Sequence, residues 1–383
     1  MAKDLYEELC KFYEVFMGPL PWRDEFRRAL EETVTQEELA VFFLVPMSGS
    51  APLSKLERRA RLPATELYAC VERLASEGLI MVYTHDGQTV CERGNPAYMT
   101  EQQVRKAEDT PRRAFYARFF NSILNGEVSI AIPTKTPYYR VLPVEGTVSE
   151  SGARRVIPVE VDVPDPRAVL PVDVVSEMIR RDADSIAVAD CYCRLTKRLV
   201  GEGCGHALQT CLVFNRVAEA LVDYGTARRI SYDEAMRIIW EAEEAGLVHN
   251  VDNCEGEITS VCNCCPCCSI LLTSWQRGMT NADSPSRYRV AYEADACIAC
   301  ETCLERCPTM ARSIVDELVV IDEARCLGCG LCVTACRQGA NRMVLRDQQA
   351  RLPKTAEDLY RQIGREAMIG IALQKLTGLV RRS

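Results

Sequence analysis

CIACETCLERCPTMA at residues 297–311 and CLGCGLCVTACRQGA at residues 326–340 are two copies of one motif. Each copy has the spacing C-x2-C-x2-C-x3-C, and the second begins 29 residues after the first. Three thiolates two residues apart on a tight loop can bind three irons of one cubane, while the fourth cysteine lies on a following helical turn and points to the other cluster. The spacing therefore predicts two [4Fe–4S] clusters. Zinc knuckles are the alternative, but they pair over long separations in sequence.

The repeat also predicts which cysteines bind each cluster. The first cluster is expected to have the ligands Cys297, Cys300, Cys303 and Cys336. The second is expected to have Cys326, Cys329, Cys332 and Cys307. In both sets the fourth ligand comes from the other copy of the motif.

Residues 290–346 resemble the bacterial-type ferredoxins that hold two [4Fe–4S] clusters. Pro308 follows Cys307 as in that family, and residues 313–321 occupy the position of its usual hairpin. Arg337 departs from the pattern, because the family often has a second proline after the last cysteine. This departure changes the polarity near the first cluster but removes no ligand.

The distribution of cysteines indicates a metal-rich protein of a reducing compartment. The chain has 383 residues, enough for two or three domains, and only three of its 21 cysteines lie before residue 190. A secreted disulfide scaffold is the first alternative, but acidic residues interrupt residues 1–22, so no apolar signal-peptide core follows a basic start. Clustered cysteines in the cytosol usually bind metal or perform redox chemistry. We therefore expect a cytoplasmic protein.

Charge and hydropathy narrow the classes of partner. No apolar run approaches the roughly 20 residues that a membrane span needs. The net charge of −8 makes nucleic acid or an anionic membrane a poor partner. The expected partners are redox proteins, one donor and one acceptor, and the chain is a candidate subunit of a larger redox complex.

A second cysteine-rich region has ten cysteines between residues 191 and 268. We expect the first four, Cys191, Cys193, Cys204 and Cys211, to bind a third cluster, with glycines at 201, 203 and 205 letting backbone amides approach the sulfurs. The others are Cys254 and the possible ligands Cys262, Cys264, Cys265, Cys267 and Cys268. Adjacent cysteines rarely both reach one iron site, so some of these serve another cluster, donate hydrogen bonds or are redox-active thiols. Zinc is the alternative metal, and ten buried core cysteines are too many for a purely structural explanation.

The predicted fold class is α+β with several domains. A helix at 53–61, a turn, an amphipathic helix ending before Gly78 and a hairpin at Asp86-Gly87 follow the order of a winged-helix domain. Prolines between 133 and 166 predict an extended arm. Further helices are expected at 172–181, 212–224, 232–245 and 355–379, and a strand at 185–189. The expected divisions are a winged-helix-like domain (1–100), a proline-rich arm and connecting segment (101–184), a cysteine-rich metal-cluster domain (185–285), a two-cluster ferredoxin domain (286–346) and a C-terminal helix (347–383).

A winged helix also suggests DNA binding, and charge argues against it. The expected recognition helix has Glu66, Glu72 and Glu77 with only Arg73 as a cation, whereas DNA contact needs several basic side chains. A docking or structural module fits this charge better, while Arg58, Arg59 and Arg61 on the preceding helix keep DNA binding as the alternative. Neither His206 nor His249 is assigned as a ligand.

The whole arrangement resembles a family of multi-domain [4Fe–4S] proteins found widely in anaerobic microbes. The matching segments are TPYYRVLPV (136–144), SIAVADCYCR (185–194), AEEAGLVHN (242–250) and VCNCCPCC (261–268), followed by the ferredoxin repeat. The resemblance implies cluster binding but no substrate. The function expected is the relay of low-potential electrons through two ferredoxin clusters and a third cluster in the middle. The alternatives are an iron–sulfur oxidoreductase subunit with a catalytic cluster, and a redox-responsive winged-helix regulator.

Overall fold

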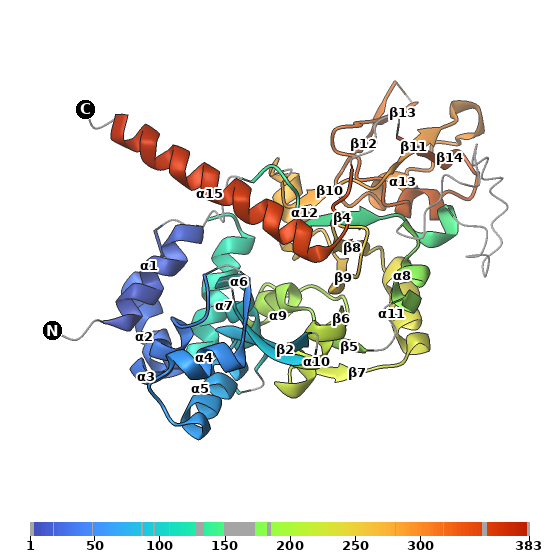
Figure 1. Cartoon of the computed structure of the whole chain (residues 1–383). Coiled ribbons are helices and arrows are strands. Elements are labelled where there is room, and N and C mark those ends of the chain that lie inside the picture. The colour runs from blue at the N-terminus through green and yellow to red at the C-terminus, as the bar shows by residue number, and fades with distance from the viewer. Residues whose placement is uncertain are drawn as a thin grey trace.

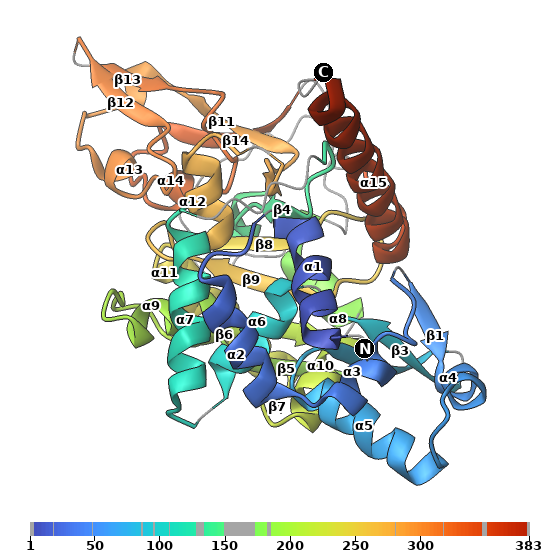
Figure 2. The same ribbon diagram turned by 90° about the vertical axis from the view of Figure 1, so that its left-hand side faces the viewer.

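A computed structural model of the chain describes residues 4–17, 19–47, 49–85, 87–94, 96–106, 108–127, 134–148, 173–181, 185–279, 281–316, 318–346 and 351–380. Helices and strands are mixed along the chain, which confirms the α+β class. The strands β11–β14 lie at one end of the molecule and the helices α4 and α5 at the other (Figures 1 and 2). Among the described helices, none is both long enough and apolar enough to cross a membrane.

The N-terminal part is mostly helical and has one apolar core. Its elements are α1 (Leu5–Met17), α2 (Arg23–Thr33), α3 (Gln36–Phe42), β1 (Ser50–Pro52), α4 (Leu53–Arg59), α5 (Ala64–Ser76), β2 (Ile80–His85), β3 (Gln88–Arg93), α6 (Pro96–Arg105) and α7 (Pro111–Leu124). Phe26 lies at the centre of the core, with its ring 5.0 Å from Phe119 and 6.0 Å from Phe115. Such aromatic packing joins α2 to α7.

The helices and hairpin expected from residues 53 to 92 are present. The strands β1, β3 and β2 form an antiparallel sheet in that order, and Leu67, Val71 and Leu74 of α5 are buried, as the periodicity predicts. The interpretation of this order as a winged-helix domain stays a prediction.

The middle part is built on a seven-stranded sheet in the order β10-β4-β8-β9-β6-β5-β7. All neighbours are antiparallel except β10 and β4. Its strands are β4 (Tyr139–Leu142), β5 (Ile186–Asp190), β6 (Gln209–Phe214), β7 (Ala227–Arg229), β8 (Val248–Asp252), β9 (Ser260–Cys264) and β10 (Asp283–Ser284). Its helices are the 3-10 helix η1 (Glu145–Thr147), α8 (Val175–Arg181), α9 (Tyr192–Leu199), α10 (Asn215–Asp223), α11 (Tyr232–Glu244) and α12 (Ile270–Gln276).

The two faces of this sheet are covered by different helices. Ile186, Val188 and Leu212 pack with α8 and α11, whereas Ala187, Cys211 and Val213 pack with α10. This is the period-two alternation of a strand. It places Cys211 on the α10 face.

Two segments differ from the sequence prediction. Leu212–Phe214 were expected to start a helix, but they end β6 and are buried between β5 and β9, and the helix α10 begins only at Asn215. A short apolar run does not distinguish a buried strand from a helix. Of the expected proline arm, Pro133, Pro158, Pro164 and Pro166 lie outside the described residues. The described part includes β4, which pairs with β8 inside the sheet.

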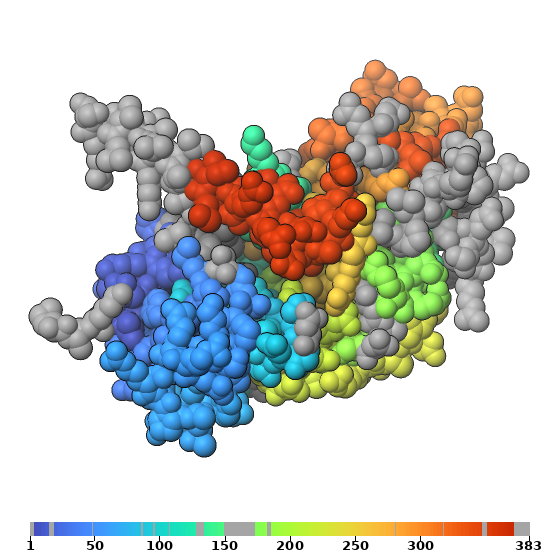
Figure 3. Space-filling model, viewed as in Figure 1, coloured from blue at the N-terminus to red at the C-terminus, as the bar shows by residue number. Residues whose placement is uncertain are grey.

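The C-terminal part contains two two-stranded sheets and a final long helix. Its elements are β11 (Tyr288–Tyr292), the 3-10 helix η5 (Ala294–Ala296), α13 (Thr302–Glu305), β12 (Arg312–Val315), β13 (Leu318–Ile321), α14 (Leu331–Thr334), β14 (Asn341–Leu345) and α15 (Ala356–Val380). The hairpin expected at 313–321 is β12–β13, and the expected last helix is α15. In the space-filling view the red part of α15 lies between the blue N-terminal part and the orange strands (Figure 3).

One apolar core joins the C-terminal part to the middle sheet. It includes Val141 of β4, Val144 just after that strand, Cys264 of β9, and Leu327, Cys329 and Leu331 of the second cysteine motif. The Val144 amide donates a hydrogen bond of 2.9 Å to the Cys329 carbonyl. The Gln276 side-chain amide donates to the Pro308 carbonyl at 2.8 Å. The second motif is therefore packed on the middle part through this core, and the first motif contacts it through Pro308.

Candidate metal centres

The four cysteines expected to bind the second ferredoxin cluster surround one cavity. Cys307, Cys326, Cys329 and Cys332 all line it, together with apolar side chains such as Val290 and Leu327. The Ala311 amide donates to the Cys307 sulfur at 3.3 Å, as amides do to cluster thiolates. Four thiols arranged around one cavity are a fitting donor set for a [4Fe–4S] cluster.

The cysteines expected to bind the first cluster lie on a more open loop. Cys300 is exposed, Cys303 is buried, and Cys297 and Cys336 are half-buried. The Ala299 amide donates to the Cys297 sulfur at 3.4 Å, and the Thr302 hydroxyl lies 3.5 Å from the Cys300 sulfur. These thiols are also a fitting donor set for a [4Fe–4S] cluster.

The two motif loops have the same backbone path but different surroundings. Ala299 and Glu301 have φ of 53° and 61°, and the equivalent Gly328 and Gly330 have 66° and 80°. A Cβ at position 328 would lie 2.0 Å from the Tyr288 carbonyl oxygen, whereas Ile298 of the first loop is 64% exposed. Only glycine fits the crowded second loop. The first loop faces solvent and the second faces the protein.

A buried arginine lies between the two ligand sets. The Arg312 side chain hydrogen-bonds to Cys303 of the first set, and its charge also acts on Cys332 and Cys307 of the second. Its Nη1 donates to Asn341 Oδ1 at 2.9 Å, and the residue is 7% exposed. A cation buried there stabilises negative clusters.

In the middle part, five cysteines form a group that we call the inner thiol group. Its members are Cys191, Cys193, Cys211, Cys262 and Cys264. The register of β6 on β9 pairs Leu212 with Val261 and so sets Cys211 opposite Cys262, and the two side chains hydrogen-bond. Cys264 follows two residues after Cys262 on the same face of β9 and hydrogen-bonds to it.

The rest of the inner thiol group comes from the start of α9. Cys191 precedes this helix and Cys193 is its second residue, and their side chains hydrogen-bond. That hydrogen bond, followed by the charge and amide of Arg194, lowers the pKa of Cys191 to about 6. The Ile270 amide donates to Cys193. Thiols that receive amide hydrogen bonds in a buried site fit an iron–sulfur cluster.

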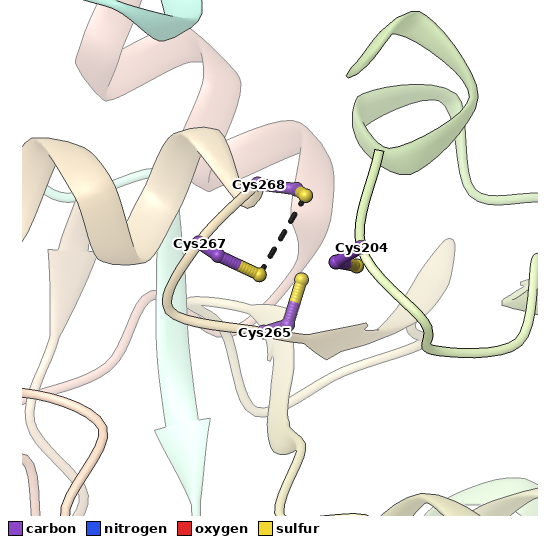
Figure 4. Close-up of side chains that lie close together, drawn as sticks. All are labelled: Cys204, Cys265, Cys267 and Cys268. Atoms are coloured by element: carbon purple, nitrogen blue, oxygen red, sulfur yellow. Dashed lines mark hydrogen bonds between the residues drawn. The ribbon is translucent and has the colours of Figure 1, made fainter. Parts of the chain in front are cut away.

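The other cysteines of the CNCCPCC run form a second group, the Cys204 tetrad. Its members are Cys204, Cys265, Cys267 and Cys268, and their sulfurs lie within 4.8 Å of one another (Figure 4). The Cys268 and Cys267 sulfurs are 3.7 Å apart. A hydrogen bond from Cys268, aided by the charge of Arg194, lowers the pKa of Cys265 to about 4.

The tetrad changes the ligand set expected from the sequence. We expected Cys204 to join Cys191, Cys193 and Cys211, but the loop after α9 takes Cys204 to the turn at residues 265–268. The remaining three of the expected set lie together with Cys262 and Cys264. Spacing along the chain does not reveal which side of the strands this loop reaches.

Two buried arginines that sequence reasoning did not assign contact these groups. Arg194 is 1% exposed, and its charge acts on Cys191, Cys264, Cys265 and Cys204, hence on both groups. Arg105 from α6 donates to the Cys211 sulfur at 3.5 Å and pairs with Glu101. The position of Arg194 directly after the C-x-C motif was a local signal, but nothing in the sequence links Arg105 to Cys211.

Cys254 and His249 lie outside these groups. Cys254 is buried against Leu359 and Ile363 of α15. His249 hydrogen-bonds through Nδ1 to Asn263 at 2.6 Å and through Nε2 to Glu243 at 3.2 Å. Both ring nitrogens are therefore occupied, which agrees with leaving this histidine unassigned.

Comparison with known proteins identifies the C-terminal module. Residues 289–337 match the 4Fe-4S dicluster domain. The chain is 28% identical over 134 residues to a subunit of the tetrathionate reductase of Archaeoglobus fulgidus, covering 32% of this chain and 62% of that protein. It is 41% identical over 46 residues to an uncharacterized ferredoxin of Methanocaldococcus jannaschii, covering 12% of this chain and 30% of the ferredoxin.

The chain thus spans less than two thirds of each of these relatives. No solved structure matches it. The matches support an iron–sulfur protein with a ferredoxin-type module at its C-terminal end.

Proposed function

We propose that this protein relays electrons between two ferredoxin [4Fe–4S] clusters and a third cluster bound by the inner thiol group. Cys297, Cys300, Cys303 and Cys336 hold the outer cluster, and Cys307, Cys326, Cys329 and Cys332 hold the second. Cys191, Cys193, Cys211 and Cys262 are the ligands proposed for the third, with Cys264 as a fifth thiol beside them. The clusters supply one-electron chemistry when bound.

The observation that supports the relay is the core shared by Cys329 and Cys264. One residue is a ligand in the ferredoxin module and the other belongs to the inner thiol group, so the two sites meet in one packed region. The exposed Cys300 loop lies in the other half of the module, where a donor or acceptor protein can approach. The order proposed is surface, first cluster, second cluster, inner cluster.

Iron and acid-labile sulfide on anaerobically purified full-length protein test the proposal. Three clusters give about twelve irons and twelve sulfides per chain. Cys193→Ser is expected to lower both to about eight, while Cys254→Ser, a matched buried cysteine outside the groups, leaves them unchanged. About eight irons in the wild-type chain would refute the third cluster.

A second candidate is a subunit of a redox enzyme, which the similarity to the tetrathionate reductase subunit favours. The native mass of the protein from its own cells tests this candidate. A stable, stoichiometric complex with a different chain supports it, and a monomer or a homo-oligomer contradicts it.

Helix α5 gives a DNA-binding regulator no support, although Lys55, Arg58 and Arg59 of α4 are exposed. On α5, Glu66 and Glu72 are exposed, and Arg73 pairs with Glu38 and Glu77. An acidic face of this kind repels phosphates. A docking or structural role remains the proposal for the N-terminal part.

A further inference from the structure

The four sulfurs of the Cys204 tetrad are close enough together to share one metal ion. A tetrahedral ion with metal–sulfur bonds of about 2.3 Å holds its four sulfurs roughly 3.8 Å apart. The Cys267 and Cys268 sulfurs are 3.7 Å apart, and all four sulfurs lie within 4.8 Å of one another. A [4Fe–4S] cubane instead places its four thiolates outside a cube of four irons, which needs wider spacing.

The two groups are also separated by the backbone. Cys264 is the last residue of β9, and its side chain lies with Cys262. Cys265 comes next, after the strand has ended, and its side chain lies with Cys267 and Cys268. Neighbouring residues of the run thus turn to different sites. Five cysteines can stand so close together in CNCCPCC because two of them belong to the inner thiol group and three to the Cys204 tetrad.

The surroundings of the tetrad suit a negatively charged metal–thiolate centre. Four thiolates around a divalent ion leave a net charge of −2, which needs compensation on the side where Cys265 and Cys268 are buried, while Cys267 is exposed. The Arg194 guanidinium offsets part of this charge, and its Nε and Nη1 have no hydrogen-bond partner among the described residues. Cys265 and Cys268 are buried against Ala242 and Leu247.

We propose that the Cys204 tetrad binds a single tetrahedral divalent ion, zinc or mononuclear iron, in a site separate from every cluster. The chemistry shared by these two ions is tetrathiolate coordination. The ion ties the loop after α9 to the turn before α12. These two helices are already joined by the hydrogen bond from the Ile270 amide of α12 to Cys193 of α9, a member of the inner thiol group. The role is structural: the ion fixes the frame around the proposed third cluster.

The test measures zinc, iron and acid-labile sulfide per chain in full-length protein purified without oxygen. Wild type is expected to contain about one zinc, or one iron in excess of sulfide. In Cys268→Ser that one ion is lost while sulfide is unchanged, and Cys254→Ser retains all metals. Loss of about four irons with four sulfides from Cys268→Ser would overturn the proposal, and so would unchanged metal content.

X-ray absorption on the wild-type protein decides the question if the variant does not fold. At the zinc edge, four sulfur neighbours at about 2.3 Å without a metal–metal distance are expected. If zinc is absent, the excess iron is expected to show the Mössbauer spectrum of a mononuclear tetrathiolate. The absence of both signals overturns the single-ion site. Because sulfide reports only on the clusters, failure here is distinct from failure of the three-cluster relay.

Discussion

Replacing Arg312 by methionine is expected to make the ferredoxin clusters harder to reduce. The guanidinium contacts Cys303 of one ligand set and acts on Cys332 and Cys307 of the other, from a position 7% exposed to solvent. An added electron is stabilised by a nearby positive charge, and removing that charge lowers the reduction potential. Methionine is unbranched and fills irregular space, so the change removes charge with little loss of packing.

Coulomb's law gives the size of the effect. A unit charge about 6 Å from the added electron, at an effective dielectric constant of about 20, contributes roughly 2.8 kcal/mol. For a one-electron couple, where about 59 mV corresponds to 1.4 kcal/mol, this is roughly 120 mV. The shift is expected in the negative direction for the cluster nearer the guanidinium, with a smaller shift in the other.

A potentiometric titration followed by EPR measures the shift. Arg342→Met is the matched control, because Arg342 is a neighbouring half-exposed arginine paired with Glu293, where solvent screens its charge. Arg312→Lys retains the charge, and we expect its shift in reduction potential to be less than half of that in Arg312→Met. A shift in Arg312→Met no larger than that of Arg342→Met would refute the electrostatic argument.

Other parts of the chain give three further expectations. Burial raises the pKa of Asp283 from 3.8 to about 7, so the folded protein keeps a proton that the unfolded chain releases above about pH 4, and stability falls as pH rises from about 4 to 7. Asp283→Asn should therefore be more stable than wild type at pH 8, by up to about 4 kcal/mol, and its advantage should be smaller at pH 5. A difference in melting temperature between variant and wild type that is the same at both pH values would contradict this. Phe119→Ala is expected to cost about 3–5 kcal/mol in denaturant unfolding because Phe119 is fully buried against Phe26, and a cost below about 1 kcal/mol contradicts the packing. Cys254→Ser is expected to leave the EPR spectrum of the reduced protein unchanged, since Cys254 lies against α15, and a lost signal would make it a ligand.

The local features of the fold were predictable, and the long-range ones were not. The hairpin β12–β13 and the helices α5 and α15 follow from patterns within a few residues. The pairing of Cys211 with Cys262 depends on the register of β6 against β9, which joins residues about fifty positions apart. The sequence shows how many cysteines the region has, but its spacing does not show which of them belong to the same site.

The same limit explains the arginines that sequence reasoning did not assign. Arg105 meets Cys211 across 106 positions of sequence, and a lone arginine on α6 has no motif around it. The strand β4 was not predicted from the sequence for a similar reason. Its four residues lie between prolines, which predict extended backbone without saying which strand they pair with. The hydrogen bonds to β8 make this extended segment a strand of the middle sheet.

The chain leaves the middle part at β10, forms the ferredoxin module, and then returns to it. After the module, the Pro353 carbonyl accepts a hydrogen bond of 2.9 Å from the Glu255 amide. Further along, Glu366 of α15 accepts hydrogen bonds from the backbone amides of Lys135 and Thr136. A module anchored at both ends cannot swing on one linker as a tethered carrier does. Electron tunnelling within this chain is therefore expected over a fixed distance, at a rate that solvent viscosity does not slow.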